Sequence, residues 1–495
     1  MWCIAATTAA MVSLRRSDNQ NIPRPGHLPR SFAPKNAPHF LQCVIATPAT
    51  NVTGSQSASP APKKALHFSL LAQIVPPHFI LQSHPKCGII EPGRDVSAML
   101  LKRIYCRVFQ ACFGLGARVL PWRKPECITG AGSLERLPGL LQSAGCKKPM
   151  IVASRRQCAA PEFIAMAERL PAWSGFHQVT ANPKIETVEQ LVTQFRAEGC
   201  DSMVAIGGGS PMDAAKAAAA RLARPSRSVA QLKGLLRVHK KIVPFAAVPT
   251  TAGTGSETTI AAVVTDENHH KYAVNDLCLI PRWAILDPAL TVSLPAGVTA
   301  ETGLDALTHA VEAYIGRFYN TRETRDLARQ AVKAIFMYLP RACADGSDLH
   351  ARQELLTASY RAGFAFTRAG VGNVHALAHT LGGLYDVPHG RANAVLLPVM
   401  LEAYGPAVYR RLAELADVVG LCPAGSQAEK ARAFIAAIYD MNRVVGIPTG
   451  FDCIRTEDLP QMAAWAEAEA NPVYPVPVIF DKDRFIQVAK RVMLS

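Results

Sequence analysis

Residues 303–314 read Gly-Leu-Asp-Ala-Leu-Thr-His-Ala-Val-Glu-Ala-Tyr, and the strongest chemical signal of the chain begins in this stretch. Asp305 and His309 are four positions apart in a run that is compatible with a helix, so both side chains leave the same helical face. The stretch therefore offers a carboxylate and an imidazole to one common point.

A second stretch, residues 372–390, repeats this spacing about seventy residues later. His375 and His379 are again four positions apart on an expected helix, and His389 follows Pro388 in an expected turn after a Gly-Gly helix stop. One carboxylate and three imidazoles can thus converge between two helices and a loop.

Such a ligand set suits a borderline divalent ion such as Fe²⁺, Co²⁺ or Zn²⁺ and leaves a coordination position open. Mg²⁺ and Ca²⁺ prefer mostly oxygen ligands. A lone histidine in an apolar run is usually an ordinary core or surface residue, but two pairs at helical spacing followed by Pro-His-Gly outweigh that interpretation. The pattern predicts a catalytic metal site.

These two motifs resemble those of the iron-dependent (group III) alcohol dehydrogenase family, and the similarity runs from about residue 99 to residue 495. The resemblance implies hydride transfer between a nicotinamide and a small alcohol or aldehyde, with Fe²⁺ as the metal, although the ligand chemistry suits Zn²⁺ nearly as well. The metal ligands that the resemblance implies are Asp305, His309, His375 and His389. It places His379 beside the substrate as a catalytic proton-relay group; a purely structural hydrogen bond is the alternative.

Length and composition bound the class of protein. The chain has 495 residues, of which 49% are hydrophobic and 18% charged, as in a soluble globular protein with two or more domains. It contains no uninterrupted run of 18 or more apolar residues, so we expect no transmembrane segment. Thirteen cysteines are scattered as singles without a C-x-x-C pair, which favours a reducing compartment, the cytoplasm.

The net charge of +15 is unevenly distributed. Residues 1–98 hold nine Lys/Arg and three Asp/Glu, residues 99–124 hold six Lys/Arg and no acid, and the remaining 371 residues carry only +3. Basic residues of this near-neutral body form no stripe with interleaved aromatic residues, so we expect no nucleic-acid partner.

The first 98 residues do not have the pattern of a folded domain, because Pro, Ser, Ala, Asn and Thr clusters interrupt every short apolar run. They could be a targeting leader, a disordered interaction tail, or upstream sequence included by a wrongly chosen start, with synthesis beginning at Met99. We favour a wrongly chosen start, because members of the iron-dependent alcohol dehydrogenase family, which this chain resembles, usually begin close to this point.

Residues 99–124 predict a helix with an apolar stripe and a basic opposite face, the stripe being formed by Leu100, Leu101, Ile104, Tyr105, Val108 and Phe109. Peripheral contact with an anionic membrane surface is one interpretation. We prefer a helix docked on the body or on a neighbouring subunit.

Residues 125–286 alternate short apolar runs with helical runs, which predicts an α/β dinucleotide-binding domain with a doubly wound parallel sheet. The expected strands include 149–154, 202–206 and 243–248, and the expected helices 134–144, 160–170 and 186–199. From residue 287 to residue 495 the runs have helical period, which predicts an all-helical metal-binding domain with helices over 324–338, 351–366, 407–419 and 427–445.

The strand at 202–206 runs into three glycines and a helix, an arrangement that lets backbone N–H groups and the helix dipole bind a pyrophosphate. We expect Ser210 to cap this helix, Pro211 to occupy its first turn and Asp213 to complete a capping box. A Thr- and Gly-rich loop follows the strand at 243–248 and can bind phosphate and ribose at the same sheet edge. With the resemblance, the expected cofactor contacts are Ser154, Asn182, Gly207, Gly208, Gly209, Ser210, Asp213, Thr250, Thr251, Thr254, Ser256 and Lys271.

One departure from the family pattern bears on the cofactor. Related chains often end the strand over 151–154 with an Asp that binds the adenosine ribose and repels a 2′-phosphate, whereas this chain has Ser154 followed by Arg155 and Arg156. Guanidinium forks match phosphate oxygens, so we expect NADP(H) to be favoured over NAD(H).

Several alternatives stay open. The complete ligand set argues against the metal-free maleylacetate reductase branch, while a glycerol dehydrogenase-like enzyme and a catalytically silent assembly or binding relative are further alternatives. The resemblance implies a homodimer or a larger homo-oligomer. The sequence does not identify the physiological alcohol or aldehyde.

Overall fold

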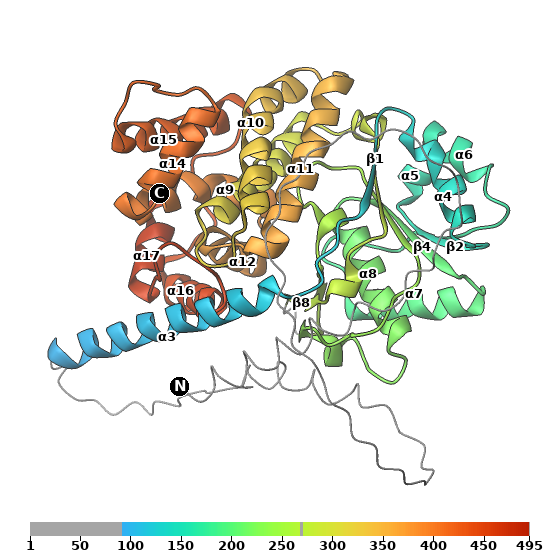
Figure 1. Cartoon of the computed structure of the whole chain (residues 1–495), viewed down its shortest axis with the longest axis horizontal. Helices are drawn as coiled ribbons and strands as arrows, with labels where there is room; N and C mark the ends of the chain where they lie inside the picture. Colours follow the sequence, from blue (N-terminus) through green and yellow to red (C-terminus); the bar gives the residue numbers. More distant parts are fainter. Residues whose placement is uncertain (1–91, 268–270, 495) are drawn as a thin grey trace, which may run out of the picture. The chain divides into compact units, whose positions relative to one another are not determined.

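The computed structural model describes residues 92–267 and 271–494 (Figure 1). The alternatives for the stretch before residue 92 therefore lie outside the described residues. Within the described part, an α/β half precedes a helical half, which confirms the predicted fold class.

A six-stranded sheet with the order β1-β9-β6-β4-β2-β3 organises the α/β half. Each of its strand pairs is parallel, as predicted. The strands are β1 (Glu126–Thr129), β2 (Pro149–Val152), β3 (Ser174–Phe176), β4 (Ser202–Gly207), β6 (Phe245–Pro249) and β9 (Trp283–Leu286). The chain leaves β2 towards β3 on one side and continues from β4 towards β6 on the other, so the strand order reverses between β2 and β4, where doubly wound sheets bind ligands.

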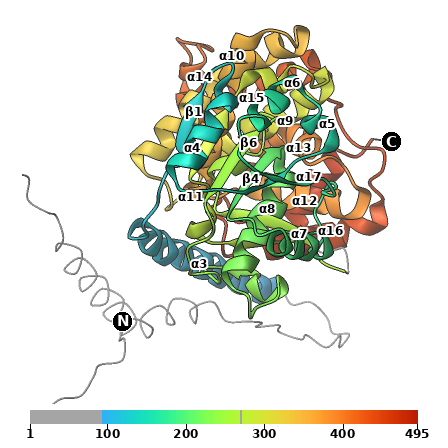
Figure 2. The ribbon, with the colours of Figure 1, turned by 90° about the vertical axis from the view of Figure 1, so that its right-hand side faces the viewer.

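Helices cover both faces of this sheet. Because successive strand side chains point to opposite faces, Met150 and Val152 of β2 pack with α7 (Ile185–Ala197) and α8 (Gly209–Ala223), and Ile151 packs with the other layer. That other layer contains η1 (Ser133–Arg136), α4 (Leu137–Ser143), α5 (Arg155–Cys158) and α6 (Pro161–Ala167). Figure 2 shows β4 and β6 between α4 and α6 on one side and α7 and α8 on the other.

A second, three-stranded sheet was not predicted. It has the order β5-β8-β7, built from β5 (Gly234–Leu235), β7 (Ala261–Thr265) and β8 (Lys271–Asn275), and its β7–β8 pair is antiparallel. These strands are short, and only β7 reads as an apolar run, so periodicity alone gave little signal for them. Short 3₁₀ helices connect the elements here, namely η2 (Ala230–Leu232), η3 (Ser256–Thr258), η4 (Leu277–Leu279) and η5 (Pro288–Thr291).

The helical half packs around α9 (Ala296–Ile315), whose residues from Gly303 to Ile315 are all buried. A helix that is enclosed on every side is expected to have an almost continuous apolar sequence. The few polar side chains of α9 depart from this expectation. The other helices are α10 (Arg322–Ala344), α11 (Leu349–Ala369), α12 (Asn373–Tyr385), α13 (His389–Tyr404), η6 (Gly405–Ala407), α14 (Tyr409–Val418), α15 (Gln427–Val444), η7 (Thr456–Asp458), α16 (Leu459–Ala470) and α17 (Lys482–Arg491).

The helix predicted over residues 99–124 is present as α3 (Pro92–Arg118), which begins before Met99 and ends earlier than expected. It docks on the body, but not through the predicted stripe: Arg107 donates to the carbonyls of Val476 and Pro477 at 2.7 and 2.8 Å, and Gln110 to that of Tyr474 at 2.6 Å. Most of the stripe faces solvent, with Leu100, Leu101, Ile104, Tyr105 and Val108 between 51% and 67% exposed. The docked face thus combines these hydrogen bonds to the 472–477 loop with the buried Cys106, which packs against Val476 and Ile479.

None of the helices within 92–267 and 271–494 combines the length and the apolarity that crossing a membrane requires.

Candidate metal centre and cofactor site

Four of the predicted residues bring donor atoms together. One atom each of Asp305, His309, His375 and His389 lies within 4.8 Å of the other three. Asp305 Oδ1 is 3.5 Å from His389 Nε2, and Asp305 Oδ2 is 3.9 Å from His309 Nδ1. One carboxylate and three imidazoles therefore surround a point where a single divalent ion could be held.

Three helices supply these side chains. Asp305 and His309 lie one turn apart on α9, and His375 lies in the first turn of α12. His389 is not in a turn, as predicted, but is the first residue of α13. The helix restarts there because Asp386 ends α12 in the left-handed conformation with φ 53° and Pro388 fixes the entry into α13.

Burial keeps the three imidazoles neutral. It lowers the pKa of His309, lowers that of His375 well below its usual value, and lowers that of His389 to about 4, outweighing the charge of Asp305 beside His309 and His389. A neutral imidazole has the free nitrogen lone pair that a metal ligand needs.

Glu312 holds His375 in place. Its Oε2 lies 2.7 Å from His375 Nδ1, and its two oxygens accept hydrogen bonds from the backbone N–H groups of Gly372 at 2.7 Å and Val374 at 2.8 Å. Gly372 is required here because a Cβ atom would come within 2.5 Å of Glu312 Oε1. With its Nδ1 bound to a carboxylate, His375 presents its Nε2 to the other ligands.

The residues present fit a cation. Asn393 Nδ2 lies 2.7 Å from Asp305 Oδ1, 3.2 Å from His375 Nε2 and 3.1 Å from His389 Nε2, so one amide group faces three acceptors with only two hydrogens. In addition, His309 Nδ1 is buried and has no hydrogen-bond partner in the described part of the chain. A bound cation would pair with the acceptor atoms of this cluster for which the protein provides no hydrogen-bond donor.

His379 lies beside the cluster but is turned towards another partner. Its ring centroid is 5.1 Å from that of His389, and its Nδ1 is 2.6 Å from Glu469 Oε1, which also accepts a hydrogen bond of 2.6 Å from the Tyr474 hydroxyl. Partial desolvation by the surrounding side chains would lower the pKa of His379, but the charge of Glu469 and this hydrogen bond raise it above its usual value. The side chain is 42% exposed, so it can exchange protons with solvent.

The glycine-rich turn at the end of β4 differs from the prediction in its cap. The helix α8 starts at Gly209 with Gly208 as N-cap and no side-chain cap, so Ser210 and Asp213 do not form the expected capping box. The helix thus begins two residues earlier than predicted, and the N–H groups of its first turn stay available to a ligand. Asp213 instead accepts a hydrogen bond of 3.2 Å from the Ser256 hydroxyl.

The predicted loop over 250–256 lies against this turn. A Cβ atom on Gly208 would meet Thr251 Oγ1 at 3.2 Å, and one on Gly209 would meet Thr254 Cγ2 at 3.0 Å. The loop reaches the helical half at Gly255, whose φ is 58° and whose Cβ position is only 2.6 Å from the Cα of Gly363 on α11.

A buried lysine ties the two segments together. Lys216 Nζ donates to oxygens of Ser256, Thr259 and Ala261 at 2.5 to 3.2 Å, and the side chain has no exposed surface. Burial lowers the pKa of Lys216 and raises those of Asp213 and Glu257, while attraction between the lysine and the two carboxylates opposes these shifts.

The remaining predicted cofactor residues lie in three places. Ser154 follows β2 as the N-cap of α5, and Gln157, its capping partner, donates to Thr250 Oγ1 at 3.1 Å, which brings this turn next to the 250–256 loop. Asn182 lies in a left-handed turn with φ 55° whose carbonyl is 3.5 Å from Thr265 Oγ1. Lys271, the first residue of β8, lies close to Gly382 of α12, whose Cβ position is 3.7 Å from Lys271 Nζ.

Four residues that the structure places in these networks had no predicted role. Glu312 and Asn393 follow a ligand by three and four positions, so helical spacing could have found both. Lys216 follows Asp213 by three positions in an alanine-rich helix, which is the same signal. Glu469 comes ninety residues after His379 and carried no local signal.

Comparison with known proteins gives matches along most of the described chain. Residues 125–288 match the family model described as iron-containing alcohol dehydrogenase, and residues 299–493 match the model described as the C-terminal part of the Fe-containing alcohol dehydrogenase family.

Individual relatives agree with these models. The chain is 38% identical over 347 residues to the NAD-dependent methanol dehydrogenase of Bacillus methanolicus, covering 68% of this chain and 91% of that protein. It is 35% identical over 343 residues to the lactaldehyde reductase of Escherichia coli K12, covering 68% and 89%. Among solved structures, a 1,3-propanediol oxidoreductase superposes with a TM-score of 0.72 at 34% identity, covering 75% of this chain and 99% of that one.

Proposed function

The chain belongs to the iron-containing alcohol dehydrogenase family, and we propose that Asp305, His309, His375 and His389 hold the metal at which it oxidises small alcohols or reduces small aldehydes with a nicotinamide cofactor. The observation that carries this assignment is the convergence of four donor atoms within 4.8 Å. We further propose that residues 125–286 bind the cofactor and residues 287–495 carry the metal.

The metal, Fe²⁺ or Zn²⁺, would supply Lewis-acid chemistry at the substrate oxygen, which stabilises a developing alkoxide and lowers the pKa of the alcohol. The protein contributes the rest. Glu312 orients His375, the turn at Gly207, Gly208 and Gly209 offers backbone N–H groups to the cofactor pyrophosphate, and Lys216 fixes the second phosphate-facing loop to that turn.

Similarity supports a proposal for the substrate class. The relatives are named for methanol, lactaldehyde and 1,3-propanediol, all small molecules with a hydroxyl or carbonyl group. We propose a substrate of this size for the present chain, a homodimer or larger homo-oligomer as the working assembly, and the cytoplasm as its compartment, which the ten free cysteines of the described residues support.

The experiment that tests this function is a panel assay on the full chain. NADH and NADPH oxidation would be followed with short aldehydes, and NAD⁺ and NADP⁺ reduction with the corresponding alcohols. We expect turnover with at least one small aldehyde and its alcohol. Tight cofactor binding without turnover on any member of the panel would instead support the silent binding relative.

We propose that NADP(H) is preferred over NAD(H), supported by exposed Arg155 and Arg156 directly after the end of β2. Ser154→Asp should raise the NADH to NADPH ratio of kcat/KM by about tenfold or more, because a carboxylate accepts from the ribose and repels a 2′-phosphate. Ser154 caps α5 through Gln157, and Asp is an equally good cap, so the fold should be unchanged. Ser154→Asn, whose side chain can cap the helix without a charge, is the matched control. If both variants had the same NADH to NADPH ratio of kcat/KM, the charge of the aspartate would not explain the cofactor preference.

We propose His379 as the group that exchanges the substrate proton, supported by its exposed ring beside His389 and its hydrogen bond to Glu469. His379→Gln should lower kcat by about 10²-fold, the typical contribution of a general acid–base group, while the protein keeps its metal content. An unchanged kcat, with the metal content also unchanged, would leave His379 a structural role only.

A further inference from the structure

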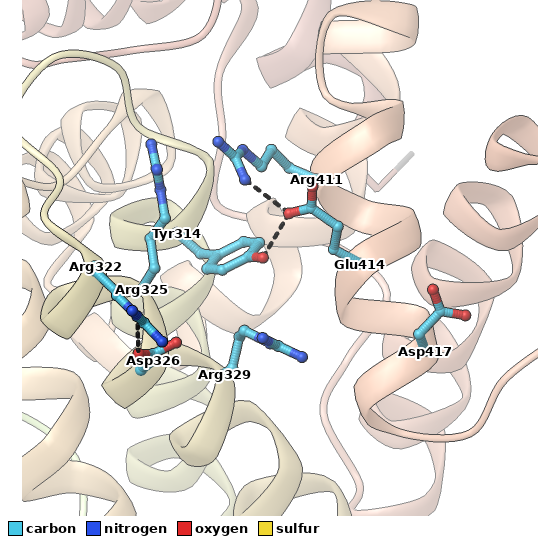
Figure 3. Close-up of a pocket in the computed structure, with 8 residues that line it drawn as sticks. All are labelled: Tyr314, Arg322, Arg325, Asp326, Arg329, Arg411, Glu414 and Asp417. Carbon is cyan, nitrogen blue, oxygen red and sulfur yellow. Dashed lines mark hydrogen bonds and ion pairs between the residues drawn. The ribbon is translucent and has the colours of Figure 1, made fainter.

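A cavity of about 420 Å³ lies away from the residues assigned above, between the end of α9, the start of α10 and α14 (Figure 3). We call it the arginine pocket, because its lining includes Arg322, Arg325, Arg329 and Arg411. Its volume is within the range of roughly 300 to 1,000 Å³ in which proteins bind small molecules.

The sequence places these cations on one face. Arg322, Arg325 and Arg329 are three and four positions apart in the first turns of α10, so their side chains leave the helix in the same direction. Figure 3 shows Arg329 extending from α10 towards α14. In the same view, Arg411 lies on the opposite side of the Tyr314 ring from Arg329.

The acids of the pocket already have partners. Glu414 accepts hydrogen bonds from the Tyr314 hydroxyl at 2.6 Å, from Arg411 at 2.7 Å and from Arg410 at 3.1 Å. Asp417 accepts from Lys430 at 2.6 Å, and Asp326 forms a longer ion pair of 3.8 Å with Arg322. The lining carboxylates are therefore largely neutralised by residues other than Arg325 and Arg329.

Two guanidinium groups are left over. Neither Arg325 nor Arg329 forms an ion pair with any residue of the described ranges, and Arg325 Nε is buried there without a hydrogen-bond partner. The cations lie close enough to repel one another: burial and then the charge of Arg411 lower the pKa of Arg325, which the charge of Glu414 only partly offsets. An anion in the pocket would pair both groups and relieve this repulsion.

We propose that the arginine pocket binds a small molecule carrying a diphosphate group, either as free pyrophosphate or as part of a nucleotide. Two unpaired guanidinium forks match the tetrahedral oxygens of two linked phosphates, and charge-assisted bonds of this kind are among the strongest polar contacts. The cavity has room for more than a single phosphate. This assignment is independent of the function proposed above.

The test is calorimetric titration of the full chain, depleted of metal by a chelator that is then removed, with inorganic pyrophosphate in the presence of saturating NADP⁺. By the proposal above, NADP⁺ occupies both the phosphate-binding turn at 207–209 and the 2′-phosphate position at Arg155 and Arg156. We expect one site, weakened about tenfold or more by Arg329→Gln and by Arg325→Gln. Arg329 is exposed, so its replacement should not disturb folding. The control is Arg443→Gln, which removes the same charge from an α15 side chain that is 76% exposed and outside the pocket.

The outcomes separate the alternatives. Binding that is absent at millimolar pyrophosphate, or that survives both pocket variants, or that falls equally in Arg443→Gln, would overturn the proposal. ADP serves as a second probe: tighter binding than pyrophosphate identifies a nucleotide, and weaker binding identifies the free anion. Citrate binding as tight as pyrophosphate binding, or a change in oligomeric state caused by the pocket variants without any anion, would also overturn it.

Discussion

Replacing Asp305 by asparagine is expected to reduce turnover by about 10³-fold or more and to reduce the metal content of the purified protein in parallel. Asp305 is the only anionic member of the ligand cluster, and its oxygens face both His309 and His389. Asparagine has the same shape without the charge, so the variant removes attraction to a cation and little else.

Loss of folding must be distinguished from loss of metal in this variant. In the presence of a chelator, the thermal midpoints of the wild type and of Asp305→Asn should be similar, because neither protein then contains the ion. The control is Asp440→Asn on α15, where the side chain is 68% exposed; its metal content and turnover should equal those of the wild type. A fully active Asp305→Asn protein with bound metal would remove Asp305 from the proposed ligand set.

Replacing Lys216 by methionine is expected to lower the free energy of unfolding by about 3 to 5 kcal/mol. The ammonium group is completely buried, and its loss leaves the half-buried Asp213 and the buried Glu257 without their cation. It also removes the donor from the carbonyls of Ser256, Thr259 and Ala261.

Denaturant unfolding measures this change, and the KM for the cofactor should rise as well, because Lys216 joins α8 to the segment after the 250–256 loop. The control is Lys333→Met, which removes a lysine from the exposed face of α10 and should change stability by less than about 0.5 kcal/mol. Equal stabilities of the two variants would show that the buried ammonium contributes nothing net.

The sequence predicted those parts of the fold that depend on local periodicity. The strand over 202–206 and the helices of the C-terminal half were found because burial on one or all sides requires a regular apolar pattern. The β5-β8-β7 sheet was missed because β5 has only two residues and β7 and β8 have five each, and no clear period appears in so few residues.

The candidate site shows the same division. Asp305 and His309 could be paired from helical spacing, but the capping of α8 by Gly208 rather than Ser210 depends on how closely Thr251 and Thr254 approach the turn. Likewise, the pattern of α3 indicated a helix that docks on the body, but it did not indicate that Arg107 would dock by donating to the carbonyls of Val476 and Pro477. Tertiary hydrogen bonds of this kind leave no trace in one sequence.

The most direct test of the central claim is a titration of the metal-depleted full chain with Co²⁺, followed both by its visible absorption and by aldehyde-dependent oxidation of the nicotinamide cofactor. We predict that the absorption of nitrogen- and oxygen-bound Co²⁺ saturates at one equivalent per chain, that turnover rises in proportion to it, and that Asp305→Asn lacks both signals. Full turnover of the depleted chain before any metal is added would contradict the assignment of Asp305, His309, His375 and His389 as a catalytic metal centre.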